Sequence, residues 1–243
     1  MAKSISKLLE WVGRLIKGLI GLLLIVPLIT MGIAVLDQLS AIPVGSRSLA
    51  GWAVIGSWSY LGVHLLFYKP TTLFRTHHRM LSKLAIGLFG GQVSTATPAG
   101  GGEKPKARGK ARAERGGESS QGSTLLVLSP YLIPLYTLLV CVGSWISRRW
   151  WESTSVELVT GLLLGASLTM HWVMTADDLQ QDRDRFPLDA YLPALAIIGL
   201  ISLFVVCLCL PLAVPGFSPP SVLTDTFVHS KAVYLAAVRT LFF

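Results

Sequence analysis

Five long apolar runs constrain what this chain can fold into more than any other feature. They cover approximately residues 19–36, 49–68, 125–146, 156–174 and 191–214. Each is close to the roughly 20 residues that an α-helix needs to cross the hydrocarbon core of a bilayer. A sixth run, at residues 84–93, is only about half as long and predicts a short re-entrant or buried helix. We therefore predict an all-α, polytopic membrane helical bundle of about five transmembrane helices and one short helix.

The distribution of charge supports this fold class. Hydrophobic residues make up 52% of the 243 residues and charged residues only 14%. The charges gather in a few loops, whereas a soluble domain spreads charge over every exposed face. Cys141, Cys207 and Cys209 all lie inside apolar runs, where cysteine acts as a small hydrophobe. Their spacing fits no CxxC metal pair, and we expect no disulfide framework.

The composition divides the chain into five regions. They are an N-terminal amphipathic surface helix, a first membrane region, a flexible basic loop, a second membrane region and a tail, at residues 1–17, 18–93, 94–123, 124–214 and 215–243. The first could equally be the basic flank of the first span. No cleavable signal peptide is evident, so the first apolar run is expected to stay as an anchor. The final stretch, 227–243, predicts a second surface helix.

The loop at 94–123 bears on partners and orientation. Its six basic and three acidic residues have no aromatic residue among them, so anionic lipid is a better partner than nucleic acid. Lysine and arginine favour the cytoplasmic side of a membrane. If 84–93 re-enters the membrane, 16 of the 21 lysines and arginines share the side of the N-terminus; if it spans, the split is 12 to 9. We therefore expect a cytoplasmic N-terminus.

Two features inside the apolar runs suggest specific roles. Gly161 and Gly165, followed by Ala166 and Ser167, form a small-residue face that predicts close helix packing. His64 lies within the second run, and an ionisable group at membrane depth is a candidate functional residue. A neutral histidine that is hydrogen-bonded to a neighbouring helix is the simpler interpretation, and we prefer it.

A short motif after the second run resembles a known active site. The motif is His78-Arg79-Met80-Leu81-Ser82, followed by Leu-Phe-Gly-Gly at residues 88–91. With the strings at 128–136 and 171–180, it resembles bacterial integral membrane metallopeptidases of the site-2-protease type over about residues 50–213. In that family the two histidines of His-Glu-x-x-His bind zinc, the glutamate activates a bound water, and a later carboxylate completes the site.

The resemblance implies a degenerate family member in the bacterial inner membrane. His78 matches the first histidine, but Arg79 stands at the glutamate position and Ser82 at the second histidine. Arginine cannot act as a base and its charge opposes Zn²⁺. We therefore expect no catalytic residues and no cofactor. The expected function is that of a non-catalytic accessory or scaffolding subunit of a larger membrane assembly, for example respiratory or photosynthetic.

Two alternatives stay open. The first is a zinc-dependent membrane peptidase with an irregular metal site, for which the weak candidate ligands are His78, His171, Asp177 and Asp178. The second is a small transporter, but the apolar runs hold few polar groups and no internal repeat. The expected partners are membrane lipids and other membrane protein subunits.

Overall fold

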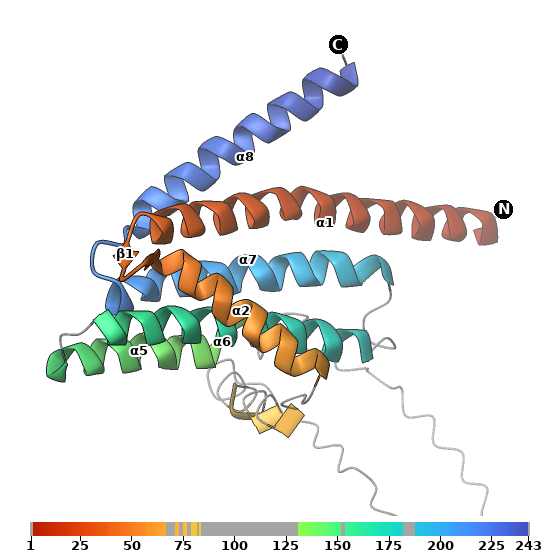
Figure 1. The fold of residues 1–243 in the computed structure, drawn as a ribbon. Coiled ribbons are helices and arrows are strands. Elements are labelled where there is room, and N and C mark those ends of the chain that lie inside the picture. The colour runs from red at the N-terminus through yellow and green to blue at the C-terminus, as the bar shows by residue number, and fades with distance from the viewer. Residues whose placement is uncertain are drawn as a thin grey trace, which may run out of the picture.

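The computed structural model describes residues 2–66, 131–151, 154–181 and 188–242, with short pieces between residues 71 and 83. Six long helices occupy this described part (Figure 1), at Ala2–Ser40 (α1), Leu49–Leu66 (α2), Leu135–Trp150 (α5), Thr154–Gln181 (α6), Leu188–Ala213 (α7) and Pro219–Phe242 (α8). A two-stranded antiparallel hairpin, Pro43–Val44 (β1) with Arg47–Ser48 (β2), joins α1 to α2. The predicted all-α class is confirmed.

Four of these helices are long and apolar enough to cross a membrane. They contain the candidate spans Trp11–Ser40, Leu49–Leu66, Thr154–Gln180 and Ala190–Ala213. These spans coincide with four of the five predicted ones. The length and composition of these helices therefore indicate a multi-pass membrane protein.

The predicted span at 125–146 differs from the observed helix. Helix α5 begins at Leu135, directly after Pro134, whose ψ of 73° is not helical. A proline inside a helix loses a backbone hydrogen bond and its ring clashes with the preceding turn, so the helix starts after it. The 16 residues of α5 reach about 24 Å, less than the roughly 30 Å hydrocarbon core. Residues 125–130 lie outside the described part.

The N-terminal region also differs from the prediction. The expected surface helix at 1–17 and the expected span at 19–36 belong to one continuous helix, α1. Gly18 is the weakest helix former between them, and a single glycine costs only about 1 kcal/mol. Pro27 lies inside α1 and cannot donate to the carbonyl of Leu23, four residues earlier. The hydroxyl of Tyr234 on α8 donates to that carbonyl instead.

The long helices form two tight pairs, and the members of each pair run in the same direction. In the first pair, α1 packs on α7. A Cβ atom added at Gly21 would lie 3.0 Å from Pro193, and one added at Gly199 would lie 3.0 Å from Leu28. Backbones can approach this closely only where a side chain is missing.

In the second pair, α2 packs on α6 through glycines from both helices. A Cβ at Gly56 would overlap the carbonyl of Leu162, and one at Gly165 would overlap the carbonyl of Ala53. A Cβ at Gly161 would lie 2.8 Å from the Cβ of Trp52. Gly161 and Gly165 therefore lie at the crossing of α2 and α6, and Gly56 on the facing helix completes it.

Helix α8 lies along α1 rather than apart from it. It begins at Pro219, before the predicted 227, and runs antiparallel to α1. The side chain of Gln38 exchanges two hydrogen bonds with the backbone of Ser218, and the buried hydroxyls of Thr30 and Ser230 lie 2.7 Å apart. Thr30 lies inside a candidate span. Helix α8 therefore contacts α1 through its first two thirds, while its C-terminal part diverges from the bundle (Figure 1) and only Val222 and Ser230 are buried. That α8 lies on the membrane surface stays a prediction.

The helix directions give the bundle two distinct ends. We call one the hairpin end: it holds β1 and β2, the end of α5 with the start of α6, and the end of α7 with the start of α8 (Figure 1). The opposite end holds the start of α1, the ends of α2 and α6, and the start of α7, whereas α5 begins about half-way along α6, where Thr137 contacts Ser167. Within the described residues, the core between these ends is apolar and includes Met31, Cys207 and Leu210, all at most 2% exposed.

Candidate functional site

A polar cluster on the second half of α6 is the best candidate for a functional site. His171, Thr175 and Asp178 follow one another at helical spacing, so they share one face of α6. Tyr131, just before α5, lies across this face. Its hydroxyl donates to Oδ2 of Asp178 at 2.6 Å, and its carbonyl oxygen lies 3.0 Å from Nε2 of His171.

The contact with Tyr131 determines the protonation of one nitrogen of His171. A carbonyl oxygen only accepts hydrogen bonds, so Nε2 of His171 is the donor and carries the proton. His171 is 2% exposed and Tyr131 is 6% exposed, so this bond lies inside the protein. A nitrogen that donates its proton in this way cannot offer a lone pair to a metal ion.

Tyr131 therefore joins His171 and Asp178, two of the three candidate ligands of α6. An apolar cluster surrounds it, in which Met174, Leu179, Ala194 and Ile198 are buried. Thr175, between the two polar partners, is fully buried, and its hydroxyl makes no hydrogen bond within the described residues. These bonds hold the segment before α5 against α6. We call this cluster of Tyr131, His171 and Asp178 the clasp, because its role is structural.

A second polar pair lies on α2. The hydroxyl of Tyr60 and Nδ1 of His64 lie 3.2 Å apart, with ring centroids separated by 5.6 Å. Within the described residues, His64 is therefore bonded to Tyr60 of its own helix. A bond from its other nitrogen to a neighbouring helix stays a prediction. Asp177 and Asp178 lie within α6, although the sequence placed them in the loop that follows the fourth span.

The remaining predicted site residues cannot all be compared. His78 and Ser82 lie outside the described residues. Arg79 is described and is exposed. Among the described residues, no three His, Cys, Asp or Glu side chains are grouped so that they could hold a metal ion. The bonds to Tyr131 use Nε2 of His171 and Oδ2 of Asp178 and leave Nδ1 and Oδ1 aside. It is the lack of a third ligand among the described residues that does not fit a zinc site, and we derive no step through zinc.

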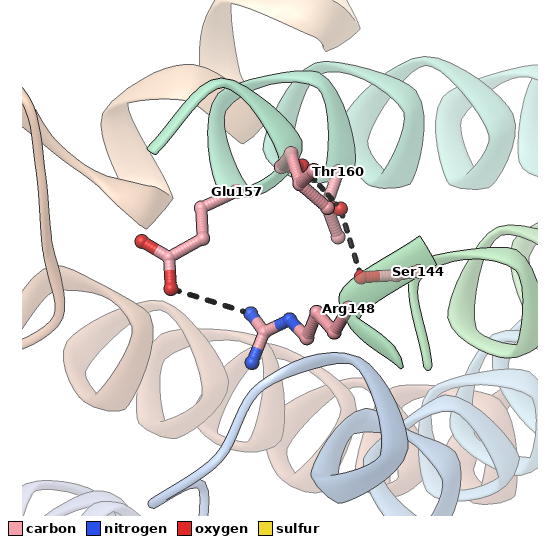
Figure 2. A network of polar contacts seen from close by, with 5 residues as sticks. Ser144, Arg148, Glu157 and Thr160 are labelled. Atoms are coloured by element: carbon pink, nitrogen blue, oxygen red, sulfur yellow. Dashed lines mark hydrogen bonds and ion pairs between the residues drawn. The ribbon is translucent and has the colours of Figure 1, made fainter. Parts of the chain in front are cut away.

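A polar network near the hairpin end joins α5 to α6. Figure 2 shows Nη2 of Arg148 reaching toward Glu157, at 3.5 Å, and the hydroxyls of Thr160 and Ser144, which lie 2.9 Å apart. The two hydroxyl-bearing residues are buried, whereas the ion pair is partly exposed. This network fixes the two antiparallel helices near the turn between them.

Sequence reasoning missed Tyr131, Thr175 and the network in Figure 2. The spacing of His171, Thr175 and Asp178 was the available signal for a polar face on α6. Nothing in the sequence identifies Tyr131 as its partner, because the two segments are separated by 40 residues or more. Comparisons with models of known protein families, with curated proteins and with solved structures found no match.

Proposed function

We propose that this chain is a non-catalytic integral membrane protein that serves as an accessory or scaffolding subunit of a larger membrane assembly. In this proposal it is a degenerate relative of site-2-type metallopeptidases in the bacterial inner membrane. It needs no cofactor. Its partners are membrane lipids and other membrane protein subunits.

The observation that carries the proposal is that Tyr131 bonds two candidate metal ligands at once, one through its hydroxyl and one through its carbonyl. His171 and Asp178 are two of the three described candidate ligands, and Asp177 is the third. The first two are bonded to Tyr131, at 3.0 Å and 2.6 Å. These two bonds hold the segment before α5 against α6, which supports a structural role. Arg79 and Ser82, at the positions of the lost glutamate and histidine, support the same conclusion.

The helix directions support a cytoplasmic N-terminus. The end of α2 lies toward the same end of the bundle as the start of α1 (Figure 1), and Tyr131, just before α5, bonds Asp178 near the end of α6 at that same end. The segment between α2 and α5 would then begin and end on the N-terminal side, as it does if 84–93 re-enters the membrane. Arg47, Arg148 and Arg149 lie at the hairpin end, which would face away from the cytoplasm. In this arrangement α5 serves as the fifth, short span.

The outer faces support lateral partners. Large apolar side chains are exposed on several helices, among them Trp58 at 70%, Leu65 at 79% and Phe227 at 70%. Apolar area of this extent is stable only against lipid or against other membrane proteins.

Zinc content tests the loss of catalysis. The purified protein is expected to hold no stoichiometric zinc, and His78→Ala is expected to leave its metal content unchanged, with His229→Ala as a matched control on an exposed histidine. Stoichiometric zinc that disappears only in His78→Ala would favour the alternative, a zinc-dependent peptidase with an irregular site.

A gain-of-metal variant tests the kinship itself. Arg79→Glu combined with Ser82→His rebuilds His-Glu-x-x-His, and a retained scaffold is expected to gain zinc. Failure of the folded double variant to gain zinc would contradict the descent from such peptidases.

Isolation from native membranes in mild detergent tests the subunit role. Other membrane proteins are expected to co-purify in stoichiometric amounts. A chain that always isolates alone would contradict the subunit role.

A further inference from the structure

A cavity lies at the centre of the bundle, where the two tight helix pairs meet. Its volume is ≈ 250 Å³. Helices α1, α2, α6 and α7 all contribute to its wall, and among the lining residues are Gly32, Val35, Ala53, Leu164 and Leu203. Apart from Gly32, these residues are less than a tenth exposed. The inner part of the cavity wall therefore belongs to the core.

The wall of the cavity is suited only to an apolar ligand. Among the described residues, no charged side chain lines it. The hydroxyl of Ser57 is already bonded to the carbonyls of Ala53 and Gly165, at 3.0 Å and 3.2 Å, and the indole nitrogen of Trp172 donates to Ser202 at 3.0 Å. An apolar cavity of about 150 Å³ stays free of water and holds a molecule as large as benzene. This larger cavity has room for part of a hydrocarbon chain.

The cavity opens sideways between α1 and α2. Leu36 on α1 and Val54 on α2 both line it, and they are 43% and 44% exposed. Both residues lie inside candidate membrane spans, so the opening is at the depth of the hydrocarbon core. The occupant that has access to such an opening is a lipid chain.

The long axis of the cavity runs along α1. Its wall extends along α1 from Gly32 to Leu39, a distance of about 10 Å at 1.5 Å per residue. Leu39 is next to the last residue of α1, and Leu210 lies close to the end of α7, so this part of the wall is near the hairpin end. A chain that enters from the leaflet at the hairpin end would follow this axis toward the middle of the bilayer.

We propose that this cavity binds one acyl chain of a bilayer phospholipid from the leaflet at the hairpin end, between the α1–α7 and α2–α6 pairs. The headgroup stays outside, because the wall offers it no charged partner. The lipid fills space that the side chains leave empty and joins the two helix pairs. This role does not depend on the proposed subunit function.

The test uses phosphatidylethanolamine whose acyl chain carries a photoreactive diazirine, in vesicles that contain the full chain. After irradiation, mass spectrometry is expected to find cross-links at the cavity wall in α1, α2 and α7. Gly32→Phe places a ring in the cavity, because a Cβ at Gly32 faces Leu203 at 4.0 Å. Cross-linking to the wall is expected to fall about tenfold, which corresponds to roughly 1.4 kcal/mol of lost binding.

Two further variants make the result decisive. Gly62→Phe is the matched control, because a side chain at Gly62 meets nothing within 4 Å, and its cross-linking is expected to equal the wild type. Val54→Trp narrows the opening from an exposed position, so it is expected to reduce cross-linking even if Gly32→Phe does not fold. Cross-links that spread evenly over the outer faces, or a yield that both cavity variants leave unchanged, would overturn the proposal.

Discussion

The hydroxyl of Tyr234 on α8 donates a hydrogen bond to the carbonyl oxygen of Leu23 on α1. Leu23 lies four residues before Pro27, so its carbonyl has lost its normal partner within the helix. A backbone carbonyl without a partner is costly in lipid, where no water replaces the missing donor. The contact between α8 and α1 therefore lets α1 contain a proline at membrane depth.

Removal of this hydroxyl is expected to destabilise the bundle. Tyr234→Phe should lower the free energy of unfolding by about 1–2 kcal/mol, the upper range for hydrogen bonds between membrane helices. In a Pro27→Ala background the helix supplies its own donor to Leu23, so the same substitution should cost about 0.5 kcal/mol or less. Unfolding in bicelles gives all four values. Equal costs in both backgrounds would show that the hydroxyl does not serve the carbonyl freed by Pro27.

A side chain at Gly165 is expected to separate α2 from α6. The Cβ of Gly165→Ala would overlap the carbonyl of Ala53, and overpacking of this kind costs about 1–3 kcal/mol or more. Gly62→Ala is the control on α2, because nothing lies within 4 Å of the added Cβ, and it should be neutral or slightly stabilising. Thermal unfolding in detergent compares the two. Similar melting temperatures for both variants would contradict the close approach at Gly165.

Two substitutions in and beside the clasp are expected to change the free energy of unfolding in opposite directions. Tyr131→Phe removes the donor to Asp178 and should cost about 1.5–3 kcal/mol, as for hydrogen bonds to charged groups. Thr175→Val replaces a buried hydroxyl that bonds nothing within the described residues, so stability should be unchanged or higher. Chemical unfolding of both variants measures the difference. A larger loss in Thr175→Val would mean that this hydroxyl has a partner after all.

The ion pair in Figure 2 is expected to contribute little. Arg148 and Glu157 lie 3.5 Å apart and are partly exposed, at 21% and 37%. Pairs of this kind typically contribute about 1 kcal/mol or less. Glu157→Gln should therefore lower the free energy of unfolding by less than about 1 kcal/mol, and 1 M salt should remove most of the difference. A large effect that persists in salt would identify the pair as buried in a larger assembly.

Cysteine labelling in intact cells tests the proposed orientation. In a variant without the three native cysteines, Ser46→Cys at the hairpin end should react with a membrane-impermeant thiol reagent. Gln180→Cys, at the exposed end of α6, should react only after the membrane is opened. The reverse pattern would place the hairpin end in the cytoplasm, and equal labelling of both would show that α6 does not cross the membrane.

The sequence predicted helices better than it predicted their partners. Apolar length located α1, α2, α6 and α7, because a span must match the thickness of the bilayer. It failed for α5, where Pro134 delays the start of the helix. The helix predicted at 227–243 lies within α8, which begins earlier, at Pro219.

Less of the candidate site than of the fold could be predicted from the sequence. His171 and Asp178 were identified by their residue type, but their shared partner Tyr131 depends on how α5 packs on α6. Gly161 and Gly165 were identified by spacing, whereas Gly56, which faces the carbonyl of Leu162 from α2, was not. Spacing along one helix shows which residues share a face, but it does not show which helix will cover that face.

The two glycine-packed pairs have a mechanical consequence. Within each pair the backbones interlock at Gly21 and Gly199 or at Gly56 and Gly165, so neither partner can slide without a clash. Between the pairs there is no such glycine packing among the described residues; the helices meet around a cavity, beside which Trp172 donates to Ser202. The molecule should therefore deform as two rigid rods that tilt against each other. The protein would adapt to a change in bilayer thickness by a change in the angle between the two pairs. It would be compliant to this tilting and stiff to sliding within a pair.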